Sequence, residues 1–560
     1  MAETRNRSLP AEGYRLEIGA GGTSLVAADD AGARHGRATL AQLRHAAGAP
    51  GPSGEPTLPG CRIDDWPDFA VRGVMLDIAR DRVPTLPALF ALVDRLAGWK
   101  LNQLQLYTEH TFAYAGHEDV WRQASPYSAA DIEAIGAHCA GRGIELVANQ
   151  NTLGHFDRWL VHERYRPLAI APDGFEWIGG IRRSPMTLDP ANSDAFALVT
   201  DLLGQLVPVV GSRRVHIGLD EPWELAPERR PEWVDWLRRL VALPVMASHE
   251  ALVWGDVLAA DPALLAGIGD GVTVCEWGYE DNHPFDDRAA ALAGAGVPFW
   301  LCPGTSSWLS ISGRVENMLG NIAAAAGAGL DHGAAGILTT DWGDMGHHQQ
   351  PIVSEPGLAV AAAFSWCAAS HRALDLDALA TVLDVHAFDD PAGALGAAVV
   401  GLGRVPRLVT PQVPNMSALV FPLLLPQWRV GRGATAGLSP EDLDAVETAL
   451  DDALALIGRA RPRRPDAASL LDQVRATVSL LRLSAHDARL RLAGDGSLAS
   501  VPAADRRTLA GELDAVVSEH RRLWLEAFRP GGLGDSVAWF DHLGSCYRSG
   551  QADRGWFGPF

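Results

Sequence analysis

Short apolar runs alternate with stretches of helical periodicity from Arg72 to about Cys367. Apolar residues three and four positions apart mark the helical stretches, and apolar runs bounded by turn residues mark buried strands. Eight such repeats over about 270 residues fit a (β/α)8 TIM barrel, which typically takes ~250 residues. The alternative is a doubly wound open sheet, but no GxGxxG motif follows a strand, and eight repeats favour closure. The predicted strands are 73–79, 101–107, 144–150, 214–220, 251–256, 272–278, 298–304 and 335–344.

Two differently patterned segments flank the predicted barrel. The leading segment alternates apolar and polar residues around a Gly-Gly pair, which predicts a hairpin, and it continues into a helical stretch and a Pro/Gly-rich linker at 48–60. The trailing segment has three-four apolar spacing, which predicts helices. The predicted organisation is a short, truncated N-terminal α/β segment over 1–66, the catalytic barrel over 67–371 and a C-terminal α-helical domain over 372–560.

Composition narrows the classes of function. The net charge of -21 at pH 7 argues against nucleic acid and anionic membranes as partners, and it suits a neutral or cationic small substrate. The six cysteines are scattered singly, so they predict neither a metal site nor a disulfide framework. We expect a cytoplasmic protein with reduced thiols, because the first residues lack an apolar leader. No apolar run looks long enough to span a membrane.

The predicted fourth strand runs into two adjacent carboxylates, Asp220 and Glu221. Joint ionisation of neighbouring acids is unfavourable, and a protein can use this cost to keep one carboxyl protonated as a general acid while the other stays ionised. Catalytic residues of a (β/α)8 barrel lie at the C-terminal ends of its strands, which is where this pair falls. The two acids could instead simply open the next helix, where negative charge suits the helix dipole.

Other polar and aromatic residues also fall at the predicted strand ends, which a barrel brings together at one mouth. A single tryptophan at such a place is more often core. Several of them beside a carboxylate pair favour a sugar pocket, because sugars present apolar C–H faces as well as hydroxyls. The candidates are Arg72, Asp77, Arg80, Glu109, His110, Asn151, His155, Trp254, Glu276, Trp277, Thr305, Trp308, Trp342 and Asp344.

Five segments occur in an order that resembles a known family. They resemble the barrel motifs of glycoside hydrolase family 20, the β-N-acetylhexosaminidases, over about residues 11–370. The leading segment resembles only the end of the small α/β domain that precedes the barrel in that family. The motifs are RGVMLD at 72–77, LNQLQLY at 101–107, TLGH at 152–155, HIGLDE at 216–221 and WGD at 342–344.

The resemblance implies an exo-acting enzyme that releases terminal N-acetylglucosamine or N-acetylgalactosamine with retention, using the acetamide of the substrate as the nucleophile. Glu221 would be the general acid and base, and Asp220 would hold the acetamido N–H and stabilise an oxazolinium intermediate. No cofactor or metal is implied, because the acid pair and the acetamide suffice. Further roles implied by the resemblance are the C3 and C4 hydroxyls for Arg72, the C4 and C6 hydroxyls for Asp344, support of the acid for His155, and a cage around the acetamido methyl for Trp254, Trp277 and Trp342.

Several positions depart from the pattern of the family. Leu219 stands where a second glycine is usual, and Asn151 replaces a carboxylate. The tyrosine that usually donates to the acetamide oxygen after the seventh strand has no evident match, which could weaken stabilisation of that oxygen. We therefore predict a divergent bacterial member that keeps the catalytic pair and rebuilds the pocket. The candidate pocket residues at the changed positions are Glu109 and His110, where two aspartates are common, and Thr305, Ser306 or Trp308, in place of the tyrosine.

Other interpretations stay open. His347 and His348 could contact a sugar hydroxyl, or they could lie on a solvated loop. The changed residues would also suit a sugar-binding protein without turnover. A glycosidase for a sugar that lacks the acetamide would need a different nucleophile. The Arg- and Trp-rich segment 520–543 could cap the barrel or pack against a second subunit, which leaves a homodimer open.

Overall fold

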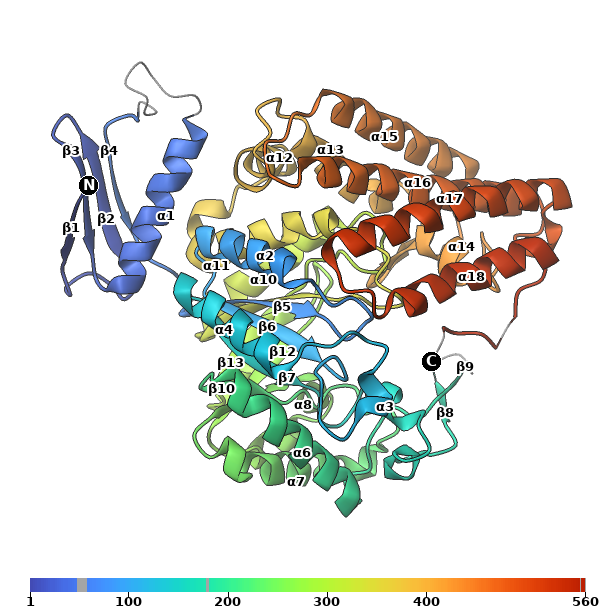
Figure 1. Ribbon diagram of the computed structural model, residues 1–560, viewed down its shortest axis with the longest axis horizontal. Helices are drawn as coiled ribbons and strands as arrows, with labels where there is room; N and C mark the ends of the chain where they lie inside the picture. The colour runs from blue at the N-terminus through green and yellow to red at the C-terminus, as the bar shows by residue number, and fades with distance from the viewer. Residues whose placement is uncertain (48–57, 178–180, 554, 559–560) are drawn as a thin grey trace.

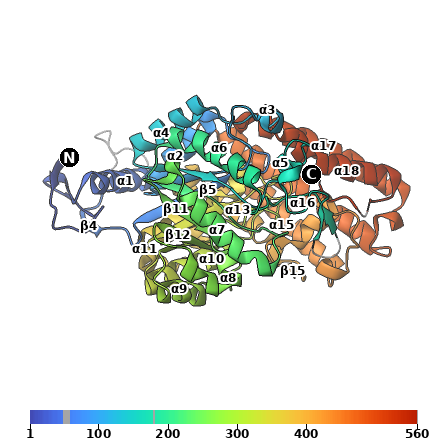
Figure 2. The same cartoon turned by 90° about the horizontal axis from the view of Figure 1, so that it is seen from below.

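The computed structural model describes residues 1–47, 58–177, 181–553 and 555–558, and most of the predicted linker lies outside these ranges. Three parts follow one another along the chain (Figure 1). A small sheet with one helix stands at one end, a barrel lies in the middle, and a group of long helices packs on the barrel. The view turned by 90° shows the same order along the long axis (Figure 2).

Eight parallel strands close into a barrel, so the predicted TIM barrel is confirmed. The last strand pairs with the first, with Gly336 opposite Val71 and Asp341 opposite Leu76. Every strand overlaps a predicted one, but the fourth ends at His216, four residues earlier than predicted. The strands are β5 (Val71–Asp77), β6 (Gln103–Thr108), β7 (Glu145–Gln150), β10 (Arg214–His216), β11 (Glu250–Trp254), β12 (Val272–Trp277), β13 (Phe299–Cys302) and β14 (Gly336–Asp341).

Amphipathic helices surround the barrel. In the first of them, Leu89, Val93 and Leu96 lie three or four positions apart and are buried against the strands. Two stretches of this layer, Ser193–Val210 and Pro351–His371, are long and apolar enough to cross a membrane by length and composition, and 39% and 78% of them are buried inside the fold. The helices are α2 (Leu86–Gly98), α4 (Ala129–Arg142), α6 (Ser193–Val210), α7 (Arg230–Val241), α8 (Asp256–Ala260), α9 (Phe285–Gly294), α10 (Val315–His332) and α11 (Glu355–His371).

The N-terminal part is a four-stranded sheet with one helix, α1 (Asp30–Ala46), packed on it. The strands lie in the order β1 (Ala2–Arg5), β3 (Gly22–Ala27), β2 (Tyr14–Gly19) and β4 (Cys61–Asp65). The predicted hairpin is confirmed, because β2 and β3 pair antiparallel. A buried cluster joins this sheet to the barrel, in which Lys100 contacts Asp65 and lies over the ring of Trp366.

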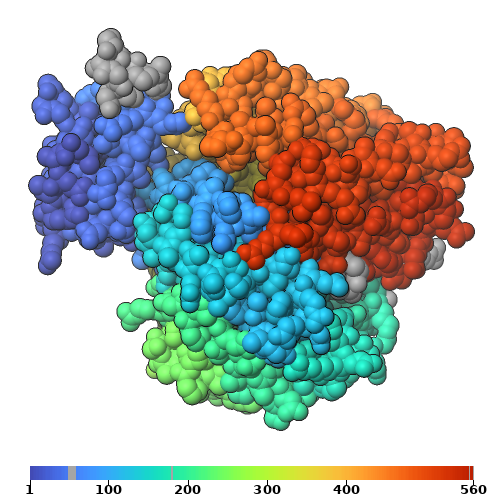
Figure 3. Space-filling view, viewed as in Figure 1, coloured from blue at the N-terminus to red at the C-terminus, as the bar shows by residue number. Residues whose placement is uncertain are grey.

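The C-terminal part is helical and covers one side of the barrel (Figure 3). It packs on loops that follow three barrel strands. Arg158, after β7, pairs both with Asp81, after β5, and with Asp535 of the last helix. Ser536 donates a hydrogen bond to the carbonyl of Gly346, after β14. The helices are α12 (Leu376–Val382), α13 (Leu395–Gly403), α14 (Phe421–Leu424), α15 (Pro440–Arg459), α16 (Ala467–Leu492), α17 (Ala503–Ala527) and α18 (Leu533–Ser549).

Candidate active site

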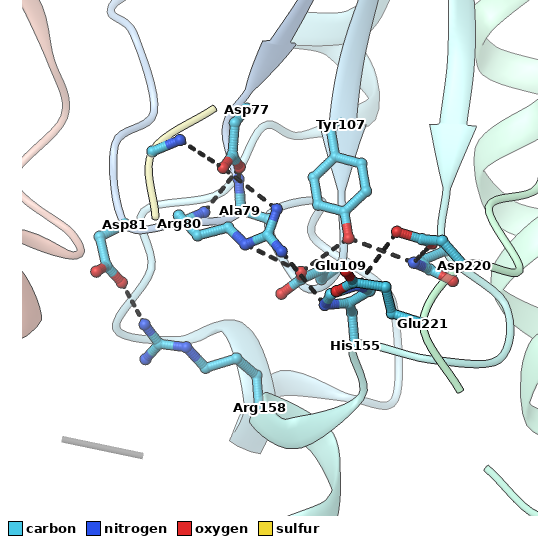
Figure 4. Close-up of polar contacts among 12 residues, drawn as sticks. Asp77, Ala79, Arg80, Asp81, Tyr107, Glu109, His155, Arg158, Asp220 and Glu221 are labelled. Atoms are coloured by element: carbon cyan, nitrogen blue, oxygen red, sulfur yellow. Dashed lines mark hydrogen bonds and ion pairs between the residues drawn. The ribbon is translucent and has the colours of Figure 1, made fainter. Parts of the chain in front are cut away.

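Polar side chains from four strand ends meet at the C-terminal mouth of the barrel. Figure 4 shows the guanidinium of Arg80 between carboxylates, with His155 and the pair Asp220 and Glu221 beside it. The chain reaches this arrangement through a strained turn after β10. Leu219 has φ 76° and Glu221 has φ 46°, in the left-handed region that L-residues seldom adopt. Such strain at a mouth of this kind is typical of a functional site.

Close packing fixes the turn. The indole of Trp233 donates to the carbonyl of Leu219 at 2.8 Å. Gly218 has φ 69°, and a Cβ placed on it would lie 2.8 Å from the Cα of Asn151. A glycine is therefore required at Gly218 both by its backbone angle and by the space around it.

Replacing Gly218 with alanine is expected to lower the free energy of unfolding by about 2 kcal/mol, from the left-handed backbone and from overlap with Asn151. Urea denaturation measures this change. Gly204→Ala is the matched control, because Gly204 lies in α6 with nothing within 4 Å of its added Cβ, and alanine favours a helix there. Equal stability of the two variants would contradict the account of the turn.

Asp220 is buried and ionised. Its side chain is 8% exposed, one oxygen accepts a hydrogen bond from Nδ2 of Asn151 at 2.6 Å, and the other lies 3.2 Å from Nε2 of His155. Burial opposes ionisation, but His155, Arg80 and the Asn151 amide outweigh it and lower the pKa of Asp220. Burial likewise opposes the charge on His155, but the Asp220 carboxylate raises the pKa of His155 well above its usual value.

Glu221 is the more open member of the pair. Its side chain is 29% exposed, and one oxygen lies 3.4 Å from Nε2 of His155. Its backbone N–H donates to Oδ2 of Asp256 at 3.0 Å. Burial and the neighbouring carboxylates of Asp220 and Glu221 raise the pKa of Asp256 to about 8. Asp256 is therefore protonated at neutral pH and fixes the backbone of Glu221 without adding a negative charge.

Asp256→Asn is expected to flatten the dependence of stability on pH. In the folded state Asp256 keeps its proton up to about pH 8. In the unfolded chain the same carboxyl loses its proton above about pH 4. The folded state then binds more protons, so this group destabilises the fold as pH rises toward its folded pKa. Between pH 6 and 8 the wild type should lose about 2 kcal/mol of unfolding free energy more than the variant, measured by urea denaturation. Parallel curves would mean that Asp256 is ionised throughout.

Arg80, rather than Arg72, lies at the mouth of the barrel. Its Nη1 lies 3.4 Å from Asp77, its Nε 3.7 Å from Glu109 and its Nη2 3.2 Å from Nδ1 of His155. Its guanidinium also lies over the rings of Tyr107 and Trp342, at 5.0 and 4.9 Å. A planar guanidinium held in this way is suited to donating hydrogen bonds to hydroxyl oxygens.

The prediction that Arg72 binds sugar is wrong. Arg72 is the second residue of β5, about 16 Å along the strand from Asp77 at the mouth. Its guanidinium is fully buried at the other end of the barrel, where Nη2 pairs with Glu12 at 2.7 Å and the other nitrogens donate to the carbonyls of Phe69 and Lys100. Arg72 is a structural residue that ties the barrel to the N-terminal sheet.

Glu109 lies at the mouth of the barrel. Its neighbour His110 is outside the described contacts of the acid pair, Asp220 and Glu221. The hydroxyl of Tyr107 donates to Glu109 at 3.0 Å. Burial raises the pKa of Glu109 to about 7, against the attraction of Arg80. His110 is buried, and its Nδ1 has no hydrogen-bond partner among the described residues. Burial keeps the pKa of His110 well below its usual value, so it is neutral.

Aromatic side chains cluster at the C-terminal ends of the barrel strands. The rings of Trp254 and Trp342 lie 6.1 Å apart. Trp277 stacks on Tyr279 at 5.2 Å, and Trp308 meets Tyr279 edge-on at 5.0 Å. The structure therefore brings all four predicted tryptophans together.

Tyr279 is a pocket residue that the sequence did not single out. Its hydroxyl accepts a hydrogen bond from the indole of Trp342 at 2.7 Å and also lies within hydrogen-bond reach of the hydroxyl of Thr340. It follows β12, in the segment EWGYE. Thr305, by contrast, has its hydroxyl committed to Asp341 at 2.6 Å.

The loop after β14 is folded into the protein, so the solvated-loop alternative for His347 and His348 is wrong. Nδ1 of His347 lies 3.3 Å from the carbonyl of Arg80, and Nε2 of His348 lies 2.9 Å from that of Ser536. Burial raises the pKa of Asp344 to about 6, against the attraction of Arg80. In the described part of the chain no group of three or more His, Cys, Asp or Glu side chains could hold a metal ion.

An ionised buried carboxylate, a more open one beside it, a guanidinium fork and an aromatic wall at the mouth of a TIM barrel define the site of a glycoside-processing protein. Comparison with known families agrees. Residues 1–66 match the family described as "Glycosyl hydrolase family 20, domain 2", and residues 69–250 match "Glycosyl hydrolase family 20, catalytic domain". These matches cover the N-terminal part and the first four barrel strands, and they confirm the resemblance to glycoside hydrolase family 20.

Two relatives and one solved structure illustrate the similarity. A β-N-acetylhexosaminidase of Cellulomonas fimi is 26% identical over 332 residues, which are 56% of this chain and 63% of that protein. Human hexosaminidase D is 27% identical over 322 residues, or 50% of this chain and 61% of that protein. The chain thus matches less than two thirds of the length of either. An N-acetyl-β-hexosaminidase structure from Streptomyces plicatus has a TM-score of 0.53 at 23% identity, covering 67% of this chain and 79% of that one.

Proposed function

We propose that the protein is an exo-acting β-N-acetylhexosaminidase that hydrolyses terminal β-linked N-acetylglucosamine or N-acetylgalactosamine with retention. One observation carries the proposal: Asp220 is buried and held by Asn151 and His155, while Glu221 beside it is more open. The names of the relatives from Cellulomonas fimi and Homo sapiens support the same activity.

In the first step Glu221 gives its proton to the glycosidic oxygen, and the acetamide oxygen attacks the anomeric carbon as that bond breaks. The nucleophile is part of the substrate and is already oriented, so little entropy is lost on reaching the transition state. Asp220 accepts the acetamido N–H and balances the positive charge that develops on the oxazolinium. Glu221 then removes a proton from water, which opens the oxazolinium ring from the face that the aglycone left. Two inversions give net retention.

The remaining pocket residues bind the sugar. Arg80, in place of Arg72, donates to ring hydroxyls, together with Asp344. Trp254, Trp277 and Trp342 enclose the acetamido methyl group. The hydroxyl of Tyr279 donates to the acetamide oxygen, in the role for which no residue after β13 was found.

Release of p-nitrophenol from the β-N-acetylglucosaminide and β-N-acetylgalactosaminide, with the plain β-glucoside and β-galactoside as controls, tests the proposal. We expect activity confined to the acetamido sugars and inhibition by a thiazoline mimic of the oxazolinium. Comparable cleavage of the plain glycosides would support a glycosidase with another nucleophile. Saturable binding of N-acetylglucosamine without hydrolysis of any glycoside would support the sugar-binding protein.

A further inference from the structure

Three aromatic side chains form a cluster outside the pocket, which we call the aromatic rim: Trp177, Trp223 and Phe557. The ring of Trp177 lies 6.1 Å from that of Trp223, nearly perpendicular to it, and 5.8 Å from that of Phe557. The guanidinium of Arg183 lies over the rings of Trp177 and Phe557, at 5.3 and 5.4 Å. These contacts join segments from three distant parts of the chain.

The rim adjoins the general acid. Trp223 is two residues after Glu221, and its N–H donates to the carbonyl of Glu221 at 2.7 Å. Trp177 lies in β8 (Phe175–Trp177), which pairs with β9 (Ile181–Arg183) in the loop that follows β7. Since β7 and β10 are neighbours in the barrel, the two loops leave the mouth side by side. The rim therefore lies beside the segment that carries Glu221.

The C-terminal part supplies the third ring. Phe557 lies 6.3 Å from Trp539 of α18, and Trp556 meets the same indole at 4.8 Å. The contact between Phe557 and Trp177 brings this described stretch of the chain beside β8. The helical domain, whose role the sequence left open, thus anchors an aromatic residue near the mouth of the barrel.

The position of the rim indicates which part of the substrate it would contact. Asp220 is nearly inaccessible, whereas Glu221 is 29% exposed, so the leaving group departs on the side of Glu221. Trp223 is 44% exposed there, so part of its indole is open to solvent. An exposed indole face beside a charged guanidinium suits the C–H face and the hydroxyls of a pyranose.

We infer that the aromatic rim binds the sugar on the reducing side of the cleaved bond, so that β-linked oligosaccharides gain contacts that small aryl or alkyl glycosides lack. This inference rests on the proposed hexosaminidase activity and assigns its leaving group. Trp223 contacts the first sugar beyond the bond, and Trp177 with Phe557 contacts the second.

The test compares kcat/KM for N-acetyl-β-glucosaminyl fluoride, whose leaving group is a single atom, with that for disaccharides of β-linked N-acetylglucosamine. Trp223→Ala is expected to lower the ratio of disaccharide to fluoride about tenfold, as loss of one aromatic contact would. Phe557→Ala should lower the ratio of trisaccharide to disaccharide. Trp428→Ala is the control, since Trp428 is 41% exposed in the C-terminal part and outside the rim, and both ratios should stay as in the wild type.

Unchanged ratios in Trp223→Ala and Phe557→Ala would overturn the inference. A methyl β-glycoside needs the same protonation of its leaving oxygen as the disaccharide but has no second sugar. An equal loss on the methyl glycoside and the disaccharide in Trp223→Ala would therefore also overturn the inference, because Trp223 would then only support Glu221. If the wild type hydrolyses neither the fluoride nor any disaccharide, the proposed activity fails first. If it hydrolyses the fluoride but no oligosaccharide, the activity stands and the rim assignment falls.

Discussion

Replacing Glu221 with glutamine is expected to lower kcat about a thousandfold on a disaccharide, the middle of the range that general acid catalysis contributes. The amide keeps the shape of the carboxyl but has no proton to give. A glycoside with a good leaving group, such as 2,4-dinitrophenol, needs little protonation, so its bond should still break at a rate much nearer the wild type. Values of kcat/KM on the two substrates measure the difference, because they report the steps up to bond cleavage and not the later use of Glu221 as a base. The measurement is made at a pH where the wild type and the variant are both folded.

Glu228→Gln is the matched control, because Glu228 is an exposed glutamate a few residues further along the same loop. We expect no change of rate on either substrate. Asp220→Asn should slow both substrates alike, since Asp220 acts on the acetamide rather than on the leaving group. A near-wild-type rate of Glu221→Gln on the disaccharide would remove Glu221 from the role of general acid.

The barrel could be predicted because its signal is periodic and repeats eight times. Errors of one or two residues at each strand end do not disturb such a pattern, but they decide which side chains reach the mouth. Arg72 and Arg80 lie in one continuous segment, RGVMLDIAR. Only the direction and bounds of β5 place the first at the bottom of the barrel and the second at its mouth. The motif led to the wrong prediction for Arg72, because a motif alone does not show how far each residue lies along the strand.

Other features of the site had no local signal. The left-handed backbone of Leu219 depends on the hydrogen bond from Trp233 and on burial of the leucine side chain. The apolar pattern predicted that β10 continues through this turn, because the residues of the turn are apolar too. Contacts between segments far apart in the sequence, such as Trp177 with Phe557, can be seen only in the folded chain. The acid pair itself was predictable, because its charge is unusual after an apolar run.

Arg80→Lys is expected to lower kcat/KM for the acetamido substrate about a hundredfold while the melting temperature changes little. Lysine keeps the positive charge among Asp77, Glu109 and Asp344, so these carboxylates stay compensated. Lysine lacks the planar guanidinium that lies over Trp342 and donates in two directions. At a site that uses this geometry, lysine is not equivalent to arginine. The loss should appear mainly in KM, because hydroxyl contacts are made before the transition state as well as in it.

The same substitution at the other arginine gives the opposite pattern. Arg72→Lys should lower the free energy of unfolding by about 2–4 kcal/mol, because a buried guanidinium that serves Glu12 and two carbonyls is replaced by a group that cannot reach all three. The folded fraction should retain the wild-type kcat/KM. Activity assays at a temperature where both variants are folded, beside thermal melts, separate the two effects. A catalytic loss in Arg72→Lys with none in Arg80→Lys would return the sugar-binding role to Arg72. Because Arg72 lies near the start of β5 and Arg80 lies three residues after its end, the same substitution at each residue reports which end of the barrel holds the substrate.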